Sequence, residues 1–136
     1  MDFSPILAAT APIKLHLAAL AVAVPLAPVQ ILAPKGSPLH RALGRIWVAA
    51  MAIAAASALF ILDRPLSPHV GPFSWLHLLA IFTLWSLWRA IRAARAGRIA
   101  EHRGFMLGLA FGALLVPGLF AALTHGRILN LALFGR

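Results

Sequence analysis

The chain contains no cysteine, and only three of its 136 residues are acidic. The lack of cysteine excludes disulfides, thiolate nucleophiles, iron–sulfur clusters and cysteine-based zinc sites. The scarcity of Asp and Glu argues against a carboxylate-bridged di-metal site. Charged residues of both signs make up 11% of the chain, against about 25% in soluble domains. The sequence therefore has little polar surface with which to cover a water-soluble globule.

Apolar residues make up 62% of the chain, and this content predicts an integral membrane protein. Four segments are long enough to cross a bilayer, which takes about 20 residues. We expect spans at about 12–33, 38–62, 72–96 and 100–124, forming one all-α domain over 1–136. The predicted architecture is a transmembrane four-helix bundle. Three prolines inside the expected spans should produce kinks of the kind that membrane helices tolerate: Pro25, Pro28 and Pro117.

Basic residues give the chain a net charge of +9. They lie between the apolar runs, as topology signals do, and this distribution argues against nucleic acid as a partner. Eight basic residues fall in the first and third connections, and four fall on the other side of the membrane. The positive-inside rule then places both of these connections in the cytoplasm and both termini outside. The location we expect is a cytoplasmic membrane. The eight are Lys35, Arg41, Arg45, Arg89, Arg92, Arg95, Arg98 and Arg103.

Four of the six histidines follow an internal repeat. His16 and His77 are 61 residues apart, and His40 and His102 are 62 residues apart. A tandem two-span repeat makes the first and third spans parallel. His16 and His77 should then lie at one depth near the outer face, and His40 and His102 at another depth near the inner face.

Two histidine layers in a helical bundle are the geometry that clamps a haem between two imidazoles. We expect His16 with His77, and His40 with His102, as axial ligands of two b-type haems. Four arginines are expected to face the propionates of the inner haem, because guanidinium pairs well with carboxylate: Arg41, Arg45, Arg95 and Arg103. His69 and His125 are interpreted as interfacial residues, although either could replace an outer ligand.

Small residues near these histidines have two interpretations. Ala19, Ala23 and Ala27 share a helical face with His16. They would leave room for a porphyrin, or they would let two helices pack closely. A second stripe points away from His102 and is interpreted as a helix contact: Gly104, Gly108 and Gly112.

Two parts of the sequence carry a family resemblance. The first is the run LHRALGRIW over 39–47. The second comprises His77-Leu78-Leu79, Thr83-Leu84, RAIRAARAG over 89–97, His102-Arg103 and Met106. Both resemble an uncharacterised family of bacterial four-span proteins catalogued as domain of unknown function 2306. That resemblance implies four helices, a bacterial inner (cytoplasmic) membrane and no established activity. The histidine pairing is also similar to that of cytochrome b561-type carriers, although these usually have six spans.

The leading functional hypothesis is a transmembrane b-type haem protein, acting as an electron carrier or membrane oxidoreductase. Its candidate partners are a quinone or a redox protein. The alternative is a non-enzymatic accessory or scaffold subunit, as a homo-oligomer or within a larger membrane complex. A proton-conducting transporter that uses the histidines is weaker, because the expected spans contain no Asp or Glu apart from Glu101 at the start of the fourth.

Overall fold

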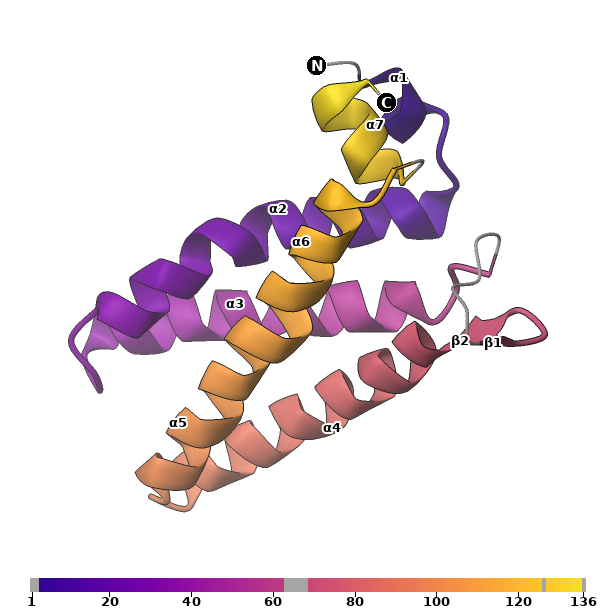
Figure 1. Cartoon of the computed structure of the whole chain (residues 1–136). Coiled ribbons are helices and arrows are strands. Elements are labelled where there is room, and N and C mark those ends of the chain that lie inside the picture. Colours follow the sequence, from indigo (N-terminus) through magenta and orange to yellow (C-terminus); the bar gives the residue numbers. More distant parts are fainter. Residues whose placement is uncertain (1–2, 63–68, 126, 136) are drawn as a thin grey trace.

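The computed structural model describes residues 3–62, 69–125 and 127–135, which are almost entirely helical (Figure 1). A short hairpin and a π-helical segment (η1) interrupt the α-helices. In chain order the elements are α1 (Ser4–Leu7), α2 (Ala11–Leu32), α3 (Pro38–Ala58), β1 (His69–Val70), β2 (Phe73–Ser74), α4 (Trp75–Arg95), α5 (Ile99–Gly108), η1 (Leu109–Leu115), α6 (Val116–Leu123) and α7 (Ile128–Phe134).

Three helical stretches in the described part of the chain are long and apolar enough to cross a membrane: α2, α3 and the continuous stretch Ile99–Leu123. Helix α4 is 21 residues long but more polar, because it contains His77, three tryptophans and three arginines. Many large apolar side chains are exposed, among them Val24, Ile81 and Phe111. Such a surface suits lipid rather than water. The all-α membrane class is therefore confirmed, and a fourth span remains a prediction.

Serine caps fix the starts of two long helices. The Ser37 hydroxyl accepts the His40 backbone N–H at 3.1 Å, and Pro38 follows at the first helical position. Helix α4 begins at Trp75 and not at the predicted 72, because residues 69–74 form the hairpin and Ser74 then caps the helix. Helix α3 ends at Ala58, before the predicted 62.

Helices α2, α3 and α4 lie side by side in chain order, and the stretch α5–η1–α6 crosses them obliquely (Figure 1). Helices α2 and α4 run in the same direction, as a tandem two-span repeat requires. The oblique crossing differs from a regular four-helix bundle, so the bundle and the repeat stay predictions. The core joins all four stretches and consists of Ala23, Ala27, Trp47, Ala50, Met51, Leu87, Leu109, Ala110 and Leu114.

The kink expected at Pro117 takes the form of a π-helical turn. Proline has no backbone N–H and cannot continue the helical hydrogen-bond ladder. The wider turns of η1 immediately precede Pro117, as is typical where a helix must absorb a missing donor. In contrast, Pro25 and Pro28 lie within the continuous helix α2.

The glycine stripe lies on open surface within the described chain. A Cβ placed on Gly104, Gly108 or Gly112 would meet no atom within 4 Å. The helix contact expected from this stripe would therefore have to come from another chain.

Candidate functional site

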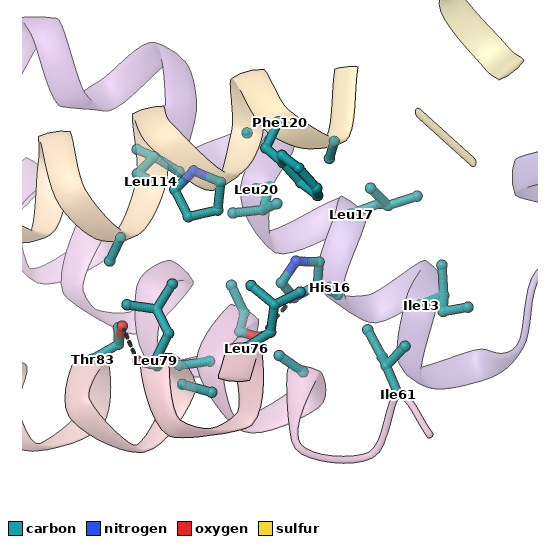
Figure 2. Close-up of a pocket in the computed structure, with 18 of the residues that line it drawn as sticks. Ile13, His16, Leu17, Leu20, Ile61, Leu76, Leu79, Thr83, Leu114 and Phe120 are labelled. Carbon is teal, nitrogen blue, oxygen red and sulfur yellow. Dashed lines mark hydrogen bonds between the residues drawn. The ribbon is translucent and has the colours of Figure 1, made fainter. Parts of the chain in front are cut away.

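A cavity of about 240 Å³ lies between α2, α3, α4 and the stretch η1–α6, with the start of α7 also lining it (Figure 2). Its walls are mainly apolar and include Leu17, Leu20, Leu76, Leu79, Leu114 and Phe120. Both His16 from α2 and His77 from α4 line it. The structure thus brings together, around one cavity, the two histidines that the repeat assigns to the outer layer.

The imidazole of His16 is oriented by helix α3. Its Nδ1 lies 2.7 Å from the backbone oxygen of Ala54. A carbonyl oxygen only accepts, so Nδ1 carries the proton and donates. The Nε2 atom of the neutral ring is then left with its lone pair. His16 therefore offers the cavity a hydrogen-bond acceptor.

The imidazole of His77 is held in the opposite tautomer by the start of its own helix. The Ser74 backbone N–H donates to His77 Nδ1 at 3.0 Å, completing a capping box with His77 at the third helical position. Because Nδ1 accepts, the neutral ring carries its proton on Nε2. His77, which lines the cavity, is therefore a hydrogen-bond donor through Nε2.

The Nε2–H group of His77 is buried and has no hydrogen-bond partner among the described residues. His77 is only 7% exposed. An unpaired buried donor costs about 1–3 kcal/mol, so an acceptor placed beside this group would stabilise the arrangement. Thr83 also lines the cavity, and its hydroxyl donates to the Leu79 backbone oxygen at 2.8 Å. Arg127, just before α7, also lines the cavity.

The second predicted pair, His40 and His102, lies at the opposite end of the molecule, just after the C-terminal ends of α2 and α4. His40 at the start of α3 and His102 near the start of α5 are close enough for their charges to interact. His102 Nδ1 lies 3.0 Å from the Ala90 oxygen. With the amide of Gln30 turned so that its nitrogen faces α3, that nitrogen donates to His40 Nδ1 at 3.0 Å. Each pair therefore combines one histidine whose Nδ1 donates with one whose Nδ1 accepts.

The arginines expected at the propionates are all exposed, and none lines the cavity: Arg41, Arg45, Arg95 and Arg103. His125 is also exposed and outside the cavity lining. The side chain of His69 lies outside the described residues. Within the described chain, no cluster of three or more His, Asp or Glu side chains could hold a metal ion.

Sequence reasoning missed two residues that orient the histidines. Ser74 precedes His77 by three positions, which is the spacing of a capping box and was visible in the sequence. Gln30 is buried in α2 and faces His40 and Gly44. Its position in an apolar run was the only available sign of a polar contact between helices.

The long apolar helices and the exposed apolar side chains define an integral membrane protein, whose buried polar side chains include Gln30 and His77. The chain belongs to the family described as "Predicted membrane protein (DUF2306)", whose model matches residues 13–133. This confirms the resemblance that the two sequence segments indicated. Comparisons with curated proteins and with solved structures give no match.

Proposed function

We propose that the protein binds the ring of a membrane-dissolved quinol in the cavity between His16 and His77. The observation that carries the proposal is the buried Nε2–H of His77, which has no partner within the described chain, on a residue that lines the same cavity as His16. A quinol hydroxyl can accept from His77, and the same or the second hydroxyl can donate to His16. Apolar walls suit the ring and the start of its isoprenoid tail.

The oxidised form of the ligand fits the same two histidines less well. A quinone has carbonyl oxygens, which accept and cannot donate. One carbonyl can accept from His77, but His16 Nε2 would then face an oxygen lone pair without a proton between them. The arrangement therefore favours the reduced form. The cavity volume of about 240 Å³ lies just below the usual range of about 300–1,000 Å³ for ligand pockets, which points to a single ring.

A b-type haem carrier is the second candidate, supported by two histidine pairs on non-consecutive helices. In His16 and His102 the Nδ1–H donates to a backbone carbonyl, an arrangement that leaves Nε2 for iron. His77 fits less well, because ligation through Nε2 would require it to give up its capping bond from Ser74. The cavity would also have to widen for a macrocycle. For these two reasons a quinol is a better candidate ligand than a haem.

A short-chain quinol, reduced decylubiquinone, is expected to bind once per chain and about tenfold more tightly than its oxidised form. One additional hydrogen bond to a buried acceptor accounts for a factor of this size. Quenching of tryptophan fluorescence in detergent-purified protein measures both affinities. In His16→Leu the two affinities should become equal, mainly because quinol binding weakens. The matched control is His125→Leu, outside the cavity, which should keep the preference.

Three outcomes would count against this proposal. Equal binding of quinol and quinone by the unsubstituted protein would show that His16 does not accept a hydrogen bond from a quinol hydroxyl. A Soret band that shifts on reduction, with haem present in stoichiometric amount, would favour the haem carrier. A colourless protein that binds neither ligand would favour the accessory-subunit alternative.

A further inference from the structure

A second cavity, of about 230 Å³, lies at the turn between α4 and α5. It is lined by a tryptophan and three arginines: Trp88, Arg89, Arg92 and Arg98. We call these four residues the Arg–Trp cluster. Two of the arginines share one carboxylate. Arg89 Nη2 lies 2.8 Å from Glu101 Oε1, and Arg98 Nε lies 2.6 Å from Glu101 Oε2. The three arginines of the cluster and the carboxylate of Glu101 together carry a net charge of +2.

Arg92 carries the charge that no carboxylate balances. Its guanidinium carbon lies 4.9 Å from the centroid of the Trp88 ring, a cation–π distance. Arg92 is exposed, and no acidic side chain pairs with it in the described part of the chain. A planar guanidinium that is fixed on a ring and keeps its donors free is suited to binding phosphate oxygens in a bidentate manner.

The surroundings of the cluster indicate where the rest of such a ligand would lie. Along α4, on the face that carries Trp88, three large apolar side chains are exposed: Ile81, Phe82 and Trp85. Trp85 also stacks edge-to-face on Phe105 of α5 at 5.7 Å. Tryptophan is enriched at the membrane–water interface. The cluster therefore lies where a polar headgroup would meet a continuous apolar strip.

We propose that the Arg–Trp cluster binds the phosphate of an anionic phospholipid, with the acyl chains along the Ile81–Trp85 strip. A phosphate ester and a free phosphate would both fit the arginines, and the neighbouring apolar side chains favour the lipid. Basic pockets between membrane helices bind anionic headgroups in this way. The site is independent of the quinol cavity, because no residue lines both.

The test is binding of phosphatidylglycerol, with phosphatidylcholine as the neutral lipid, to the full chain by native mass spectrometry. Near a membrane surface one basic charge changes affinity about fivefold. Arg92→Gln is expected to weaken phosphatidylglycerol binding about fivefold. Glu101→Gln is expected to strengthen it by a similar factor, because it removes the competing carboxylate. Phosphatidylcholine binding should change in neither variant.

Arg41→Gln is the matched control, since Arg41 is exposed and lies outside the cluster. It should leave the affinity within about twofold of the unsubstituted chain. An equal loss in Arg41→Gln and Arg92→Gln would overturn the proposal in favour of diffuse surface attraction. Weaker binding in Glu101→Gln would also contradict it. Displacement of the lipid by millimolar inorganic phosphate, lost in Arg92→Gln, would assign the site to free phosphate and overturn the lipid.

Discussion

Trp47→Ala is expected to lower the free energy of unfolding by about 3–5 kcal/mol, the range for removing a large buried ring. Trp47 is 2% exposed and packs in the core among small residues, including Ala23 and Ala27. These alanines cannot extend into the space that the ring leaves, so a cavity remains. The substitution also removes the hydrogen bond from Trp47 Nε1 to the Ala23 backbone oxygen at 3.0 Å. Unfolding in mixed micelles of rising SDS content, followed by circular dichroism, measures the change.

Two variants separate packing from other effects of losing a tryptophan. Trp47→Phe keeps most of the ring and loses the hydrogen bond, so we expect a loss of about 1–2 kcal/mol. Trp75 is 38% exposed at the start of α4, and Trp75→Ala should cost less than about 1 kcal/mol. If Trp47→Ala were no more destabilising than Trp75→Ala, the core described around Trp47 would be wrong.

His77→Phe is expected to weaken quinol binding about 10- to 100-fold, as loss of a hydrogen bond in a buried apolar site does. Stability should change little. The variant loses the cap on the Ser74 N–H, which costs about 1 kcal/mol, but it also removes a buried donor that has no partner among the described residues. Fluorescence titration with reduced decylubiquinone measures the affinity, and SDS unfolding measures the stability.

Ser74→Ala is the control for the capping box, because it removes the Ser74 hydroxyl while the backbone N–H still holds His77 Nδ1. We expect this variant to bind quinol within about threefold of the unsubstituted chain. A protein in which Ser74→Ala and His77→Phe lose affinity equally would indicate that helix-end stability, rather than the Nε2–H donor, controls the site.

The juxtaposition of the histidines could be predicted from the sequence, because two matched offsets of about 60 residues carry topological information. The structure brings His16 with His77 to one cavity and His40 near His102. The tautomers could not be predicted. They depend on which backbone group faces each Nδ1, and for His16 that group belongs to Ala54, far away in the sequence.

The roles of the arginines were also beyond sequence reasoning. A helical count places Arg95 on the same face as His77, but Arg95 lines neither of the two cavities, whereas Arg89, Arg92 and Arg98 line the second. The side chain of a long, flexible arginine follows its local partners, here Glu101 and two tryptophan rings. Helical periodicity fixes only the direction in which the side chain leaves the backbone.

The most direct test of the central claim is ¹⁵N NMR of the histidine-labelled protein in nanodiscs, with and without reduced decylubiquinone. We expect His77 to be protonated at Nε2 and not at Nδ1. Its Nε2–H signal should shift when the quinol is added, and His77→Phe should lack that signal. A His77 ring that is protonated at Nδ1 with a free Nε2 lone pair, or a His77 signal that does not respond to saturating quinol, would contradict the account.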